Sequence, residues 1–431
     1  MPTGSARRSD PPGRPADVPR FPRRTGRLAA VLALSLTTAL AAAACGAKEE
    51  APATASGVAA GKATSLADFG GMDGLIAAAK KEGRLNVIAL PPDWANYGEV
   101  IEAFSKKYAI KVNNDNPDGS SADELTAVKT LKGQDRAPDV LDLGVAFAIS
   151  GAQEGLFAPY KVAAWDKIPA AQKDAEGRWF NDYGGYVSIG CDAKRVAVCP
   201  QTFADLKKPE YKGKVALNGN PTKAGAAIAA VYAASLANGG SFDDIQPGID
   251  FFAALNKSGN FIPVESTPAT VEKGETPISL DWDYLNAGYA KQFAAKGIDW
   301  KVAIPADGKY ANFYAQAVNL DAPHPAAARL WEEFLYSAEG QNLWLKGFAR
   351  PVLLPGMITD GTAQADLVAA LPKVDGEPSF PTPRRTTRPR PTWSRTGPRP
   401  WPADDADRRH HRVPARAGRR PHGVRPGGGP P

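Results

Sequence analysis

The sequence predicts an α/β fold with parallel β-strands and enough chain for two domains. Over 72–154, short apolar segments of strand length alternate with segments whose apolar residues recur at helical spacing. This alternation is typical of β-α-β units. It returns over 215–256, after a long strand-like run. The 431 residues, 43% of them hydrophobic, can bury two sizeable cores.

The first α/β region opens with a helix over 72–81, where Leu75, Ile76 and Ala79 share one face and Gly83 marks the end. A strand follows over 84–90 and stops at two prolines, which cannot continue it. The same criteria predict the next elements of this region. They are helices over 98–108, 122–131 and 147–154, and strands over 110–112 and 139–143.

The rest of the chain begins with a strand-like run over 179–190 that contains internal glycines. The second α/β region has a strand over 215–217, a turn over 218–222, and helices over 223–237 and 243–256. Beyond it we expect strands over 302–305 and 314–318, which would belong to the first domain. Helices are expected over 325–336 and from 340 onward.

The stretch 277–288 is the most informative part of the chain. Its first half is short, apolar and preceded by a proline, as in a buried strand. Its second half places two carboxylates and two rings side by side, at Asp281, Trp282, Asp283 and Tyr284. Adjacent carboxylates repel each other and lose hydration when buried. We therefore favour a polar ligand site at the end of a strand over the alternative of a surface turn.

The net charge of +6 is unevenly distributed along the chain. Residues 1–44 carry 7 Arg and 2 acids, a net of +5, and residues 381–431 carry 13 Arg and 3 acids, a net of +10. The remainder, 45–380, is 6 − 5 − 10 = −9. A basic chain with an acidic body gives no reason to expect nucleic-acid binding.

The N-terminus has the order of parts of an export signal. Four arginines lie within 20–27, a nearly uninterrupted apolar run follows over 28–44, and the run ends in small residues, Ala42, Ala43 and Ala44, before Cys45. A small-residue run before cysteine resembles a bacterial lipobox. We expect a lipoprotein signal peptide over 1–44, a lipid on Cys45 and a flexible tether over 45–64. A plain signal peptide or a short membrane anchor is the alternative.

Two further cysteines, Cys191 and Cys199, lie in the exported body. An even count outside the cytoplasm indicates a disulfide that closes a short loop. Two free buried thiols are the alternative. No His/Cys spacing supports a metal site, and we expect neither a metal nor a cofactor.

Two blocks of sequence carry a resemblance to a known family. The first is TFADL at 202–206 with PEYKGKV at 209–215. The second runs from His324 through WEEFL at 331–335 to ARPV at 349–352. With the lipobox, they make residues 28–380 resemble a solute-binding lipoprotein of an ABC importer with the type II periplasmic-binding-protein fold. The first block is similar to the branch that includes polyamine, ferric-iron, thiamine and phosphonate binders.

The resemblance implies two α/β lobes, two crossing segments and a cleft between the lobes that traps a small molecule. Lobe 1 would comprise 65–185 and 282–380, and lobe 2 would comprise 186–281. The partners implied are the small-molecule ligand and a membrane permease, for a monomer held at the outer face of the cell membrane. The implied cleft residues are Asp93, Trp94, Tyr97, Ser120, Ser121, Asp142, Tyr186, Asn220, Thr222, Asp281, Trp282, Asp283 and Tyr284.

Three ligand classes remain open at this stage. Carboxylates beside aromatic rings suit an organic cation, and Trp94 with Tyr97 resembles the Trp-x-x-Tyr segment of polyamine binders. Polyamine binders often have an acid where this chain has Asn96. Tyr183 and Tyr186 would suit ferric ion. The amides and hydroxyls of 220–222 before a helix would suit a phosphonate.

A secreted hydrolase is the competing class of protein. A Ser-His-acid arrangement would have to use His324, because the other three histidines lie in the basic tail, and the chain has no Gly-x-Ser-x-Gly motif. Paired-carboxylate glycosidase chemistry with Asp281 and Asp283 is the other hydrolase mechanism that stays open. The tail, 381–431, has 13 Arg and 12 Pro and too few large apolar residues for a core, so we expect disorder. A tail for anionic surfaces and an out-of-frame ending of a GC-rich gene are the two interpretations.

Overall fold

The computed structural model describes residues 57–374. The predicted signal peptide, Cys45, most of the predicted tether and the tail over 381–431 lie outside the described residues. Within 57–374, no helix combines the length and apolarity needed to cross a bilayer.

The first α/β region forms as predicted, with element ends shifted by one to three residues. Its β1 and β2 pair in parallel, and β3 lies beside β1, since the amide of Asp139 donates to the carbonyl of Asn86 at 2.8 Å. Gly83 ends the first helix with a φ of +71°, which glycine adopts without strain. The elements are α1 (Met72–Glu82), β1 (Arg84–Ile88), α2 (Tyr97–Tyr108), β2 (Lys111–Asp115), α3 (Ser121–Thr130), β3 (Val140–Gly144) and α4 (Val145–Gln153).

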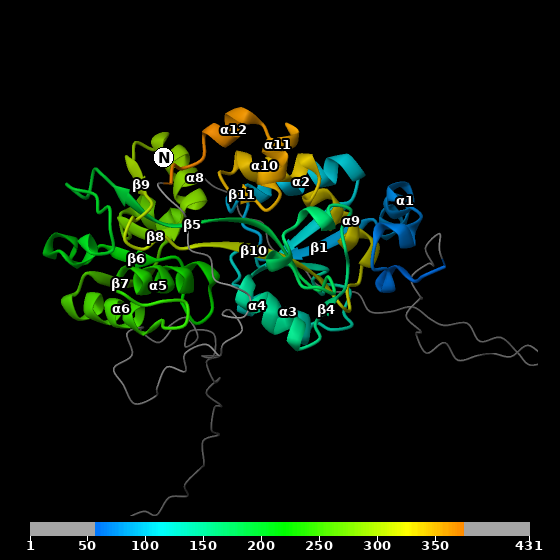
Figure 1. Cartoon of the computed structure of the whole chain (residues 1–431), viewed down its shortest axis with the longest axis horizontal. Helices are drawn as coiled ribbons and strands as arrows, with labels where there is room; N and C mark the ends of the chain where they lie inside the picture. The colour runs from blue at the N-terminus through cyan, green and yellow to red at the C-terminus, as the bar shows by residue number, and fades with distance from the viewer. Residues whose placement is uncertain (1–56, 375–431) are drawn as a thin grey trace, which may run out of the picture. The chain divides into compact units, whose positions relative to one another are not determined.

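Two long strands, β5 (Phe180–Asp192) and β10 (Ala311–Asn319), join the two halves of the fold (Figure 1). The parallel pairing predicted for the β-α-β units does not extend to these two strands. Strand β10 runs antiparallel to β3, to β4 (Phe157–Ala158) and to β5, and β11 (Arg350–Pro351) is antiparallel to β5. Apolar runs buried on both faces look the same in parallel and antiparallel sheets, so the pattern did not reveal strand direction.

The second half of β5 belongs to a sheet with β6, β7, β8 and β9. Strand β6 is parallel to β7 and β8, while β8 and β9 are antiparallel to β5. Helices α5 and α6 lie on one face of this sheet and α8 on the other (Figure 1). The elements are β6 (Val215–Leu217), α5 (Gly225–Ala237), α6 (Gln246–Ser258), β7 (Phe261–Glu265), α7 (Pro268–Lys273), β8 (Ile278–Trp282), α8 (Asp283–Ala294) and β9 (Trp300–Ala303).

The strand near 302–305, expected in the first domain, therefore pairs in the second. Strand β9 lies next to β5 in the sheet that contains β8, and the chain enters the other sheet only at β10. The lobe boundary at 281/282 stays a prediction, although β9 pairs in the sheet that contains β8 and α8 packs against that sheet.

The C-terminal part of the described chain packs helices against the first half. Helix α9 is buried along its whole length, and Trp331 and Trp344 are both 0% exposed. The helices are α9 (Pro325–Leu335), α10 (Ala338–Lys346), α11 (Leu354–Asp360) and α12 (Ala365–Ala369). Short 3-10 helices occur at Ala60–Lys62, Leu66–Phe69, Trp165–Lys167, Ala170–Gln172, Asp205–Lys207 and Pro209–Tyr211.

A disulfide joins Cys191, in β5, to Cys199 in the loop that follows. Their Cα atoms are 5.8 Å apart.

Candidate ligand-binding cavity

A cavity of about 540 Å³ lies between the first half of the fold and the region of α5, α7 and β7. One side comes from the ends of β1 and β3 and the start of α3, and the other from the starts of α5 and α7. The lining residues are Ala89, Pro91, Asp93, Trp94, Asp118, Gly119, Ser120, Ser121, Glu124, Asp142, Asn218, Ala224, Gly225, Ala226, Glu265, Ser266, Thr267, Pro268, Ala269, Tyr289 and Tyr314.

Five of the predicted cleft residues line this cavity: Asp93, Trp94, Ser120, Ser121 and Asp142. Asp93 and Trp94 follow β1, Asp142 lies within the last three residues of β3, and the two serines are at the start of α3, which is where open α/β sheets place ligand sites. The hydroxyl of Ser120 also caps α3 by accepting a hydrogen bond from the amide of Asp123.

The turn at 218–222 reaches the cavity only in part. Asn218 lines it, and Asn220 lines an adjoining hollow of about 300 Å³. The two spaces share Asp118, Ser120, Ala224 and Glu265 along their edges. Thr222 is exposed and lines neither space.

The predicted cluster at 281–284 does not line the cavity. Asp281 accepts hydrogen bonds from Asn218 Nδ2 at 2.8 Å and from the amide of Trp282 at 2.7 Å. Asp283 is 0% exposed and forms an ion pair with Arg350. Both carboxylates are thus occupied within the protein, and the rings of Trp282 and Tyr284 are buried beside them. A partner 67 positions away, such as Arg350, leaves no local trace in the sequence.

Tyr97 and Tyr186 also lie outside the cavity wall. Tyr97 is 0% exposed, and its hydroxyl accepts a hydrogen bond from Gln316 Nε2 at 3.1 Å. The ring of Tyr186 lies under the guanidinium of Arg350 at 4.8 Å, and its amide donates to Asp283 at 2.8 Å. Both tyrosines therefore hold the framework behind the site.

A chain of hydrogen bonds runs behind one wall of the cavity. Trp94 Nε1 donates to the hydroxyl of Tyr183 at 2.8 Å, and that hydroxyl donates to Asp142 Oδ2 at 2.7 Å. The other oxygen, Asp142 Oδ1, is buried and accepts no hydrogen bond from any described residue. The cavity wall thus contains a carboxylate that the Tyr183 hydroxyl holds through one of its two oxygens.

The cavity wall is acidic. It includes Asp93, Asp118, Glu124, Asp142 and Glu265, and no Lys, Arg or His among the described residues. Burial raises the pKa of Asp142 to about 6, although the hydroxyls of Tyr183 and Tyr97 lower it. Burial likewise raises the pKa of Asp93, with a smaller contribution from Asp118. Asp142 and Asp93 are therefore costly to keep ionised, and a cation beside them would stabilise their charged forms.

Sequence reasoning missed several lining residues. Asp118 lies two positions before Ser120, and Glu124 in the first turn of α3, so the predicted turn could have indicated both. Thr267 before Pro268 is a helix-start signal, and Thr267 caps α7 in the structure. No local signal marked Tyr289 or Tyr314, because each reaches the cavity only through the packing of α8 or β10.

Among the described residues, no group of His, Cys, Asp and Glu could hold a metal ion. His324 does not line the cavity; its Nδ1 lies 2.9 Å from Asp139 Oδ2, and Arg84 donates to its Nε2 at 2.9 Å. Two α/β halves joined by β5 and β10, with a polar cavity between them, define the class of two-lobed solute-binding proteins.

The chain belongs to the family described as bacterial extracellular solute-binding protein, whose model matches residues 135–372. Members of this family are exported proteins that bind small ligands and work with ABC permeases. No curated protein sequence matches the chain.

Solved structures agree with the fold. The periplasmic binding protein AfuA from Actinobacillus pleuropneumoniae, with fructose-6-phosphate bound, is 19% identical with a TM-score of 0.54, over 64% of this chain and 86% of that one. Iron-bound HitA from Pseudomonas aeruginosa is 20% identical with a TM-score of 0.51, and the match covers 70% of this chain and 94% of HitA. A putative spermidine/putrescine ABC transporter from Listeria monocytogenes is 14% identical with a TM-score of 0.51, and the match covers 67% of this chain and 88% of that protein. The predicted two-lobed type II periplasmic-binding-protein fold is thus confirmed.

Proposed function

We propose that this protein captures a small polyamine-like organic cation between its two lobes and delivers it to an ABC permease. The observation that carries the proposal is the cavity wall, which combines five carboxylates with the rings of Trp94, Tyr289 and Tyr314 and includes no Lys, Arg or His among the described residues. The volume of about 540 Å³ is in the range of small-molecule sites.

The physical chemistry of the wall supports a cation over an anion. A carboxylate pairs with an ammonium group through a charge-assisted hydrogen bond, and the face of a Trp or Tyr ring attracts a cation by about 0.5–2 kcal/mol. Asp142 lines the cavity with its carboxylate held by Tyr183, so its position in the wall is fixed before a ligand binds.

A phosphonate or another anion is the second candidate. Gly225 and Ala226 begin α5 at the cavity, and no side chain caps this helix, so its first amides could bind an oxyanion. The five carboxylates around the same space oppose that ligand. Ferric ion has less support, because Tyr183 and Tyr186 lie outside the wall and Tyr183 already serves Trp94 and Asp142.

The remaining expectations are part of the same proposal. The protein would be a lipoprotein anchored through Cys45, monomeric, and without catalytic activity. Support for the last point is that His324, the one histidine within 57–374, is held by Asp139 and Arg84 away from the cavity wall.

Isothermal titration calorimetry with a ligand panel tests the proposal. The panel is putrescine, spermidine and thiamine against alkylphosphonates and ferric citrate, at pH 7.5. We expect a cation to bind, and Asp142→Asn to weaken it by about 30-fold to several-thousand-fold, because removing one partner of a buried charge pair costs about 2–5 kcal/mol. Trp94→Ala should also weaken binding.

Asp243→Asn is the control, because Asp243 is exposed and lines neither the cavity nor the adjoining hollow. This variant should bind as tightly as the parent protein. Binding of a phosphonate or ferric ion, with no response to any cation, would refute the proposed ligand class and leave the family assignment intact.

A further inference from the structure

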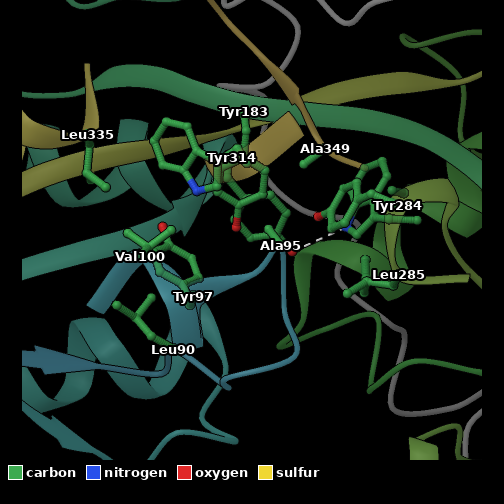
Figure 2. Close-up of a cluster of buried hydrophobic side chains, with 14 of the residues drawn as sticks. Leu90, Ala95, Tyr97, Val100, Tyr183, Tyr284, Leu285, Tyr314, Leu335 and Ala349 are labelled. Carbon is green, nitrogen blue, oxygen red and sulfur yellow. Dashed lines mark hydrogen bonds between the residues drawn. The ribbon is translucent and has the colours of Figure 1, made fainter. Parts of the chain in front are cut away.

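Tyr183 is fully buried and does not line the cavity, yet it contacts three residues that do. Its hydroxyl bonds Trp94 and Asp142, at 2.8 and 2.7 Å. Its ring stacks on that of Tyr314, with the centroids 5.8 Å apart and the planes 7° apart. Figure 2 shows Tyr183 and Tyr314 next to each other in the buried cluster. One side chain of β5 thus touches wall residues from three different parts of the chain.

The direction of the hydrogen bonds follows from the groups involved. An indole N–H can only donate, so Tyr183 must accept from Trp94 and use its single proton toward Asp142. A hydroxyl that accepts one hydrogen bond becomes a stronger donor in the next. The chain from Trp94 through Tyr183 therefore favours the ionised form of Asp142 and keeps its Oδ2 engaged.

We propose that Tyr183 is the positioning residue of this cavity: its hydroxyl holds the Asp142 carboxylate ionised and oriented while it fixes the indole of Trp94. The inference rests on the proposed function only where it concerns the ligand. Tyr183 itself touches no ligand, because it lies behind the wall.

The surroundings of Asp142 make this hydroxyl important. The carboxyls that face Asp142 are Glu124 of α3, Asp182 of β5 and Glu332 of α9. The phenol groups that also face Asp142 are those of Tyr97, Tyr183, Tyr284, Tyr314 and Tyr336. Like charges and burial both disfavour a carboxylate, so loss of the Tyr183 hydroxyl should raise the pKa of Asp142 further.

The test is the titration of Asp142 in the ligand-free full chain, followed by carboxyl ¹³C NMR and assigned with Asp142→Asn. We expect a midpoint near pH 6 in the parent protein. Tyr183→Phe keeps the ring stacking and should move the midpoint up by roughly one to two pH units, because a hydrogen bond to an ionised group is worth that much. Putrescine affinity at pH 7 should fall by about 2- to 10-fold, as the ionised fraction of Asp142 falls, and the loss should shrink above pH 8.5.

Tyr160→Phe is the matched control. Tyr160 is also fully buried and donates to a carboxylate, Glu333 Oε1 at 2.8 Å, but it does not line the cavity. This variant should leave both the Asp142 titration and putrescine binding unchanged. If Tyr183→Phe does not fold, Trp94→Phe decides the matter, and a smaller rise of the Asp142 midpoint is expected.

The outcomes separate the two proposals. An Asp142 midpoint that is unchanged in Tyr183→Phe, or in Trp94→Phe where that variant decides, overturns the positioning role. A raised midpoint in a protein that binds no cation supports the role of Tyr183 and refutes the proposed ligand class.

Discussion

The ion pair between Arg350 and Asp283 offers the sharpest test of how the two halves are held together. Asp283 begins α8 and its side chain is 0% exposed, while Arg350 lies on β11 with 17% exposed. The guanidinium also donates to the carbonyl of Pro372 at 2.7 Å and lies over the ring of Tyr186. The pair thus joins β11 to α8, next to the strand β5 that both halves share.

The perturbation is Arg350→Met, which leaves the Asp283 carboxyl buried without its cation. Breaking a buried pair in this way costs about 3–5 kcal/mol of unfolding free energy. The opposite change, Asp283→Asn, should cost less, about 1–3 kcal/mol, because Arg350 keeps its contact with water, its bond to Pro372 and its place over Tyr186.

The two variants should also differ in their pH dependence. Burial raises the pKa of Asp283, and the Arg350 guanidinium opposes that rise. Without Arg350 the folded-state pKa of Asp283 rises further above its unfolded value. A group with a raised folded-state pKa contributes stability at low pH and loses it as pH rises through that pKa. The loss of unfolding free energy in Arg350→Met, relative to the parent protein, should therefore grow from pH 5 to pH 8. The loss in Asp283→Asn should not grow over that range.

Urea unfolding of both variants at pH 5 and pH 8, followed by tryptophan fluorescence, measures these differences. Equal costs for the two changes, or an Arg350→Met deficit that is the same at both pH values, would show that Asp283 is not a buried charge that depends on Arg350.

Two further expectations concern the cysteines. Intact-mass analysis after alkylation of the unreduced protein should show Cys191 and Cys199 protected, and reduction should cost about 2–3 kcal/mol, as a short closed loop implies; two labelled thiols would contradict the disulfide. Cys45→Ala should release the protein from membranes or block its processing, and unchanged membrane fractionation of this variant would count against lipid attachment.

The sequence predicted most elements of the first half because their signals are local. Apolar residues at helical spacing and the glycine at position 83 placed α1 to within one residue of its end. Strand direction was not predictable in the same way. β5 and β10 are buried on nearly every residue, so their sequences carry no alternation that reports which neighbour lies beside them.

The site was predicted where a residue's position along a strand or turn decides its environment. Asp93 and Trp94 follow β1, and Asp142 lies near the end of β3, so topology alone brings them to one edge of the sheet. Helix α8 was not expected, and its Tyr289 was missed with it. Tyr186 was assigned to the wall because the sequence did not show that Arg350 covers its ring.

The stretch at 281–284 supports the cavity although it does not line it. Asp281 accepts a hydrogen bond from Asn218, which does line the cavity. Burial raises the pKa of Asp281 to about 7, and the hydrogen bond from Asn218 opposes that rise. Asp283 holds α8 through Arg350 and the amide of Tyr186. The two adjacent carboxylates that suggested a ligand site have separate partners, because the strand ends at Trp282 and the helix begins at Asp283. Because the backbone changes from strand to helix between them, Asp281 and Asp283 point into different surroundings. Two acids separated by one residue at such a junction therefore indicate buried structural hydrogen bonds and ion pairs as readily as a ligand site.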